Sequence, residues 1–152
     1  MQRKWTNGDP CLSYLVEGTG TPVLLLHEMG GSLRSWDEVA LLLPAQDFCV
    51  IRIDQRGAGC SEKSHSPYSQ QELCTDIESV LDDAEVSEPV LVCSVASAAA
   101  TAVSFAESAP ERVRGLVLCS PGLGVEGSAR EQGLARAALV ESEGMRALLD
   151  GA

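Results

Sequence analysis

Four short loops hold the residues whose types could support chemistry, and each loop directly follows an apolar run. The loops are residues 27–32 (HEMGGS), 54–61 (DQRGAGCS), 94–97 (SVAS) and 120–124 (SPGLG). A serine hydroxyl can attack a carbonyl carbon when a base lies within reach, so Ser94 and Ser97 are candidate nucleophiles. The chain has two histidines, His27 and His65, and His65 lies in a polar loop that favours a solvated side chain over a catalytic base.

Cofactor and metal chemistry fit the same loops poorly. A dinucleotide-binding fingerprint needs G-x-G-x-x-G, but Gly57-Ala58-Gly59 is not followed by the third glycine. The phosphate-binding motif G-x-x-x-x-G-K-[ST] does not occur. None of the six cysteines forms a C-x-x-C pair, and the histidines have no metal-ligand spacing with them. We therefore expect neither a cofactor nor a metal ion.

The elements that must position these loops are indicated by short aliphatic runs that alternate with amphipathic stretches. Four runs are typical of buried parallel strands: Pro22–Leu26, Phe48–Ile53, Pro89–Cys93 and Gly115–Cys119. Residues 11–17 alternate weakly and predict an N-terminal antiparallel strand. Between the runs lie stretches whose apolar residues have helical spacing, and these stretches begin at Trp36, Leu73 and Ala98. The pattern predicts an α/β fold, a doubly wound and mostly parallel sheet whose strand ends carry the four loops.

The composition changes near residue 128. The predicted strands all lie before that point, whereas residues 130–150 are helical in composition and no further strand follows. We therefore divide the chain into a core, residues 1–127, and an incomplete helical region, residues 128–152. Four parallel strands with an unfinished helical tail would make an unusual complete domain, so we expect a fragment of a larger fold.

The charge of the chain excludes some classes of partner. The formal net charge is −11, and such a surface repels phosphate backbones and anionic lipid. We therefore expect no nucleic-acid partner and no membrane partner. The N-terminus lacks the apolar stretch of a secretory signal, and free thiols fit a reducing compartment, so we expect a cytoplasmic protein. The open edge and apolar face of a half-sheet favour a homo-oligomer.

Several stretches of the sequence resemble the α/β-hydrolase superfamily. They are VLLLHEMGGSLRSWDEVALLL at 23–43, FCVIRIDQRGAGCSEK at 48–63 and SAPERVRGLVL at 108–118. The closing stretch, VESEGMRALLDGA at 140–152, is similar to the start of the helical cap in members of the 3-oxoadipate enol-lactonase type. The resemblance covers nearly the whole chain. It implies the N-terminal portion of an α/β-hydrolase sheet with the start of a cap.

The resemblance also implies roles for single residues. The family's triad is a nucleophile on a sharp strand–helix turn, an acid and a histidine near the C-terminus, and backbone N–H groups form its oxyanion hole. Here those N–H groups would belong to Met29 and Ala96. The resemblance gives loop-structuring roles to His27, Asp54 and Arg56. Glu28 stands where many members have a small residue, and we expect its carboxylate to point away from an oxyanion.

The nucleophile motif of the family, G-x-S-x-G, is altered in this sequence. Counting from the predicted strand places the nucleophile at Val95, whereas counting back from Pro110 places it at Ala96, and neither side chain has a hydroxyl. A serine nucleophile requires a shift of one or two residues to Ser97 or a larger shift to Ser94. The alternative is that the chain has no serine nucleophile and that these serines cap the helix that follows.

Two functions remain open at this point. The first is hydrolysis of a small-molecule ester or enol-lactone without a cofactor, through an acyl-enzyme on Ser97 or Ser94. No residue matches the triad's histidine or acid, so this function needs groups from a further C-terminal part or from another chain. The second is a catalytically inactive α/β-hydrolase-like fragment or ligand-binding module. The superfamily hosts many unrelated reactions, so the fold alone selects no substrate.

Overall fold

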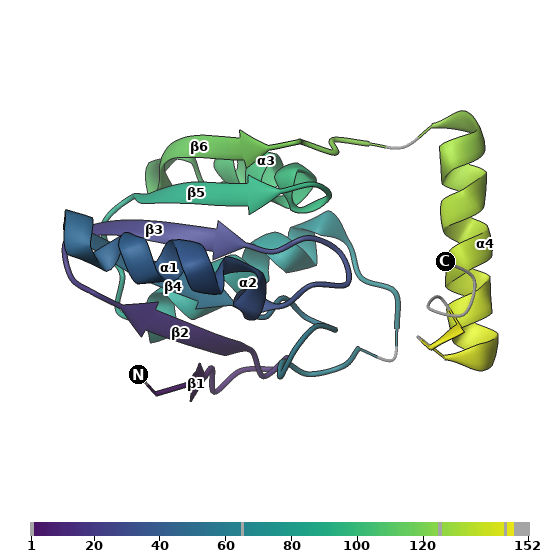
Figure 1. Ribbon diagram of the computed structural model, residues 1–152, viewed down its shortest axis with the longest axis horizontal. Coiled ribbons are helices and arrows are strands. Elements are labelled where there is room, and N and C mark those ends of the chain that lie inside the picture. Colours follow the sequence, from purple (N-terminus) through teal and green to yellow (C-terminus); the bar gives the residue numbers. More distant parts are fainter. Residues whose placement is uncertain (1, 65, 125, 145, 148–152) are drawn as a thin grey trace.

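The computed structural model describes residues 2–64, 66–124, 126–144 and 146–147, and its centre is a six-stranded sheet (Figure 1). The strands are β1 (Lys4–Trp5), β2 (Ser13–Glu17), β3 (Thr21–Leu26), β4 (Phe48–Ile53), β5 (Val90–Val95) and β6 (Val113–Cys119). Their order across the sheet is β1-β2-β4-β3-β5-β6. The four strands β3 to β6 are parallel, whereas β1 and β2 pair antiparallel. The predicted α/β class with a mostly parallel sheet is confirmed.

The predicted strands lie within two residues of the observed ones, and one of the differences affects the site. The prediction ended the third parallel strand at Cys93, but β5 continues to Val95. It continues because its pairing with β6 extends along both strands, with Val95 opposite Cys119. The two-residue strand β1, which pairs with β2, has no signal in the sequence pattern.

Three helices lie between strands, as the sequence pattern indicates, and a fourth follows the last strand. They are α1 (Asp37–Leu42), α2 (Gln70–Asp83), α3 (Ala98–Ser108) and α4 (Gly127–Glu143), with 3-10 turns at Leu33–Trp36, Pro44–Gln46 and Pro110–Arg112. A capping box starts α2: the N–H of Glu72 donates to the Ser69 hydroxyl, and the Glu72 carboxylate accepts the Ser69 N–H. This reciprocal pair satisfies donors that a helix start otherwise leaves unpaired.

The sheet is covered on both faces, with α1 on one side and α2 and α3 on the other (Figure 1). Alternate residues of β3 point to opposite faces, as the two-residue period of a strand requires. Leu24 and Leu26 join the larger core under α2 and α3, whereas Val23 and Leu25 join the smaller core under α1. The continuous apolar run of β3 is therefore a strand buried on both faces, whereas β6, predicted as buried, lies at the edge of the sheet and has no buried residue.

A buried arginine stabilises the outer part of the sheet. Arg52 of β4 is 2% exposed and forms ion pairs with Glu17 of β2 and Asp37 of α1. A buried cation without a partner would cost several kcal/mol, so these pairs are what permits an arginine inside the sheet. The pairs also connect β2, β4 and α1.

The C-terminal helix α4 stands apart from the sheet (Figure 1), and none of its residues is buried. It begins at Gly127, and residues 145 and 148–152 of the predicted helical region lie outside the described residues. The division into 1–127 and 128–152 therefore stays a prediction. No helix in the described part of the chain is both long and apolar enough to cross a membrane.

Candidate functional site

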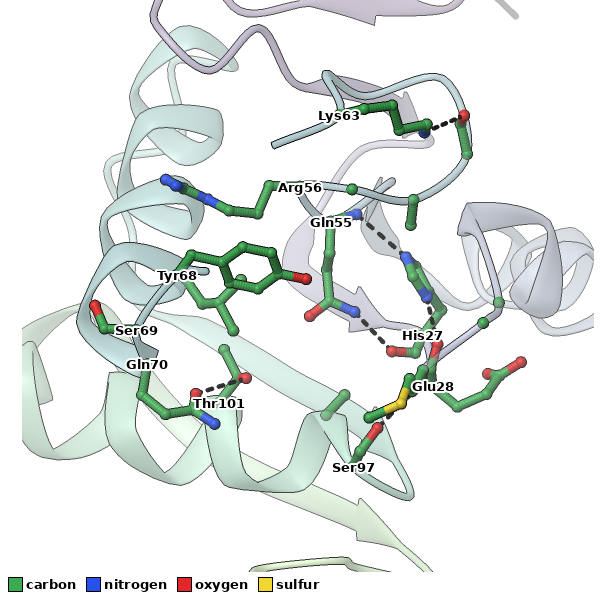
Figure 2. A pocket seen from close by; sticks show the side chains of 18 residues that line it. His27, Glu28, Gln55, Arg56, Lys63, Tyr68, Ser69, Gln70, Ser97 and Thr101 are labelled. Carbon is green, nitrogen blue, oxygen red and sulfur yellow. Dashed lines mark hydrogen bonds between the residues drawn. The ribbon is translucent and has the colours of Figure 1, made fainter. Parts of the chain in front are cut away.

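A cavity of about 680 Å³ opens at the carboxyl ends of β3, β4 and β5 (Figure 2). Its walls come from the loops after β3 and β4 and from the starts of α2 and α3. The sequence pattern predicts a ligand at this edge of the sheet. Three of the four predicted loops line the cavity, and the fourth, residues 120–124, does not.

A strained turn joins β5 to α3, and Ala96 lies at its centre. Its φ of 50° lies in the left-handed region, which costs roughly 1–2 kcal/mol for a residue with a Cβ. The Ala96 N–H donates to the carbonyl of Cys119 at 3.0 Å, and the Ala96 carbonyl accepts the N–H of Gly122 at 2.9 Å. These two bonds hold the turn from both sides. Val95, the other position considered for the nucleophile, lies within β5.

The two candidate serines have different surroundings. The Ser97 hydroxyl lines the cavity, and its oxygen accepts the N–H of Met29 at 3.1 Å (Figure 2). Ser94 is fully buried, does not line the cavity, and its hydroxyl has no hydrogen-bond partner among the described residues. Only Ser97 can therefore contact a ligand held in the cavity.

The two backbone groups expected to bind an oxyanion are both already hydrogen-bonded. The N–H of Met29 is bonded to the Ser97 hydroxyl. The N–H of Ala96 belongs to the bond with Cys119, so it is not free to meet a ligand, contrary to our expectation. The reason is again the extra length of β5, which carries the ladder with β6 up to this turn. Glu28 accepts a hydrogen bond from Ser35 at 3.0 Å, and in Figure 2 its carboxylate points away from Gln55 and Tyr68.

His27 is fixed by its neighbours on both ring nitrogens. Its Nε2 accepts the N–H of Gln55 at 3.1 Å, and Nδ1 lies 2.7 Å from the carbonyl oxygen of Glu28. A backbone N–H can only donate and a carbonyl can only accept, so the proton is on Nδ1. The ring is 2% exposed. His27 therefore joins two loops and is not placed to take a proton from Ser97. His65, the second histidine of the chain, lies outside the described residues.

Asp54 organises the loop after β4. Its carboxylate accepts the N–H of Leu33 at 2.7 Å, the N–H of Cys60 at 2.9 Å and a guanidinium N–H of Arg3 at 2.7 Å. Burial alone would raise the pKa of Asp54, but these bonds outweigh burial and lower it. A Cβ on Gly59 would lie 2.2 Å from the carboxylate, so the glycine is required for this close approach.

Arg56 connects the same loop to α2. Its guanidinium donates to both oxygens of Asp76, at 2.6 and 2.7 Å, and to Glu72 at 3.2 Å. It also lies over the Tyr68 ring, 5.7 Å from the centroid. Burial raises the pKa of Asp76, and Arg56 offsets part of that effect. Asp54 thus bonds to backbone groups of neighbouring segments and to Arg3, and Arg56 ties its loop to α2, which is the arrangement that a loop-structuring role requires.

Sequence reasoning missed several residues that line the cavity, among them Tyr68, Gln70 and Thr101. It placed Gln55 in the predicted loop 54–61 but gave it no role. The other three come from the loop before α2, from the start of α2 and from α3, which the fold brings together. No cluster of three or more potential metal ligands occurs among the described residues.

The family model of the alpha/beta hydrolase fold matches residues 21–147. The chain belongs to this family. Among curated α/β hydrolases, it is 37% identical over 129 residues to an Azorhizobium caulinodans protein named as a candidate carbamate hydrolase, RutD. That alignment covers 85% of this chain and 46% of the relative.

Solved structures show the same relationship. The enol-lactonase of Burkholderia xenovorans matches with a TM-score of 0.87 and 25% identity, over 99% of this chain and 57% of that one. A thermophilic esterase from Thermogutta terrifontis matches with a TM-score of 0.81 and 25% identity, over 95% of this chain and 55% of that one. The chain therefore spans about half the length of these α/β hydrolases.

Proposed function

We propose that this chain binds a small uncharged carbonyl compound, of the ester or enol-lactone class, and does not attack it through a serine. The observation that carries the proposal is the side chain at residue 96. The strained turn between a strand and a helix is where the family's G-x-S-x-G motif places its nucleophile. Read on that turn, the motif is Ser94-Val95-Ala96-Ser97-Ala98. A methyl group cannot form an acyl-enzyme, whatever residues elsewhere would supply a base.

The Ser97 hydroxyl supports binding of a carbonyl group. Its oxygen already accepts the N–H of Met29, so its proton is left to donate into the cavity. A carbonyl oxygen of a ligand would accept that proton beside the turn at Ala96. The relatives named as an esterase, an enol-lactonase and a candidate carbamate hydrolase support carbonyl compounds as the ligand class.

Hydrolysis through Ser97 is the second candidate function. The position of its hydroxyl, in the cavity and beside the Met29 N–H, favours it. It requires a base, and no histidine or carboxylate bonds to Ser97 among the described residues. Such a base would have to come from outside them. Ser94 is a weaker candidate because its hydroxyl does not reach the cavity.

The test is a titration of the full chain with benzyl acetate, followed by NMR for both binding and product. We expect saturable shifts in residues around the cavity and no benzyl alcohol above the buffer rate. Ser97→Ala should weaken binding, whereas Ser104→Ala, a serine of α3 that does not line the cavity, should not. Release of benzyl alcohol that Ser97→Ala abolishes and Ser104→Ala retains would establish the hydrolase instead. Absence of any binding would overturn the proposal.

A further inference from the structure

The charged side chains that line the cavity already have partners within the protein. Arg56 is paired with Asp76 and Glu72. Lys63 donates to the carbonyls of Gly59 and Ser61, at 2.8 and 3.1 Å. Glu28, the lining carboxylate, accepts the Ser35 hydroxyl in the same way. Besides these side chains, the lining offers uncharged polar groups whose hydrogen-bond directions bear on which ligand fits.

Gln55 offers the ligand an acceptor. Its side-chain Nε2 donates to the carbonyl of His27 at 2.7 Å, and its backbone N–H donates to the ring of the same histidine (Figure 2). Because a carbonyl can only accept, the amide nitrogen must face His27, and the amide oxygen must face the other way. That oxygen has no hydrogen-bond partner among the described residues. Two bonds to one buried histidine thus fix an acceptor on the wall of the cavity.

Ser97 offers the ligand a donor. Its oxygen accepts the Met29 N–H, and its own O–H has no acceptor among the described residues, so it can donate to a ligand. Among its polar groups the cavity therefore presents the fixed acceptor of Gln55 and the hydroxyl donor of Ser97. An ester or lactone has two acceptor oxygens and no donor. Its oxygen lone pairs would therefore face the Gln55 amide oxygen, which would stay without a hydrogen bond. An amide-type ligand has an acceptor and an N–H donor on the same carbonyl carbon, and satisfies both groups.

We propose that the cavity selects amide-type carbonyl compounds, such as amides and carbamates, over the matching esters, and that Gln55 makes the selection. This inference rests on the proposed binding of a carbonyl compound, and it changes the preferred ligand from esters and enol-lactones to amide-type carbonyl compounds. Sites that hydrogen-bond a ligand N–H discriminate strongly against analogues that lack it, because the site's own polar group is then left unpaired. One such bond corresponds to about a tenfold difference in affinity.

A second glutamine of the same cavity provides a matched control. The Oε1 of Gln70 accepts the hydroxyl of Thr101 at 3.0 Å, so Gln70 presents its NH₂ group rather than an acceptor. Both an ester and an amide can accept from that group. Substitution of Gln70 should therefore not change the ratio of the two affinities, whereas substitution of Gln55 should.

The experiment compares the affinities of N-benzylacetamide and benzyl acetate for the full chain by calorimetric or NMR titration. The two compounds differ only in the group beside the carbonyl, which is an N–H in the amide and an oxygen in the ester. We expect the amide to bind about tenfold more tightly to the wild type, and the ratio to fall to about one in Gln55→Met. Gln70→Met should keep the wild-type ratio. Circular dichroism verifies that each variant is folded. The ratio of amide to ester affinity in the wild type is itself a test, and it does not depend on the folding of any variant.

The outcomes separate this inference from the function on which it rests. Equal affinities in the wild type would overturn the selection by Gln55 and leave carbonyl binding intact. A preference for the amide that persists in Gln55→Met, or is lost in Gln70→Met, would also overturn it. Binding of neither ligand would overturn the proposed function itself.

Discussion

At the scale of single residues, Ala96 is the clearest departure from the chemistry of the family. It has a left-handed backbone that alanine disfavours, and its methyl group brings no reactive atom to the cavity. The surrounding structure maintains the turn through the bonds from Ala96 to Cys119 and Gly122. The strained backbone at Ala96 therefore lowers the free energy of unfolding.

Glycine at this position should therefore stabilise the protein. We expect Ala96→Gly to raise the free energy of unfolding by about 0.5–1 kcal/mol, because glycine adopts a positive φ without a Cβ clash. Ala102→Gly, in the buried middle of α3, should lower it by about 1 kcal/mol or more. Urea denaturation of the three proteins measures both effects. A loss of stability in Ala96→Gly as large as in Ala102→Gly would contradict the strained turn.

At the scale of elements, the pattern of the sequence predicts the four parallel strands well because each contains a mostly aliphatic run, whereas it gives no signal for β1. It does not predict that β5 reaches Val95, because that end depends on pairing with a strand more than twenty residues away. It likewise does not predict which end of the Gln55 amide faces the cavity, because His27 determines it. That polar loops follow the strands is thus predictable from sequence, whereas the last residue of a strand and the directions of hydrogen bonds are not.

The connection between α2 and the loop after β4 depends on Arg56. Arg56→Met would leave Asp76, which is 5% exposed, without its bidentate partner. We expect the free energy of unfolding to fall by about 3 kcal/mol, as for other broken buried pairs. Arg114→Met, which removes an exposed pair with Glu88, should have almost no effect. Equal denaturation midpoints for the two variants would be inconsistent with a structural role for Arg56.

At the scale of the whole molecule, two anchors of the fold are ionised carboxylates with a lowered pKa. Asp54 is held by three hydrogen bonds that outweigh its burial, and the hydrogen bond from Arg52 lowers the pKa of Asp37. A carboxylate whose folded pKa is below its unfolded value stabilises the fold above the unfolded pKa, near 4. That stabilisation is lost as the pH falls through the folded pKa.

The protein should therefore lose stability as the pH is lowered below about 4, and Asp54 should account for part of the loss. Asp54→Asn should be less stable than the wild type at pH 7, with a smaller decrease between pH 5 and pH 2. Asp76, whose pKa is raised, acts in the opposite sense in both proteins. The contribution of Asp54 is therefore the difference between the stability of the wild type and that of Asp54→Asn at each pH. Thermal melts across this range provide the data, and parallel curves would exclude Asp54 as an anchor.

The central claim is that the cavity of this α/β hydrolase holds a carbonyl ligand beside an alanine and does not attack it. The most direct measurement is the intact mass of the chain after incubation with a phosphonate that labels serine nucleophiles, on a sample that binds N-benzylacetamide. We predict an unchanged mass. A stoichiometric adduct that peptide mapping places on Ser97 or Ser94 would contradict the claim.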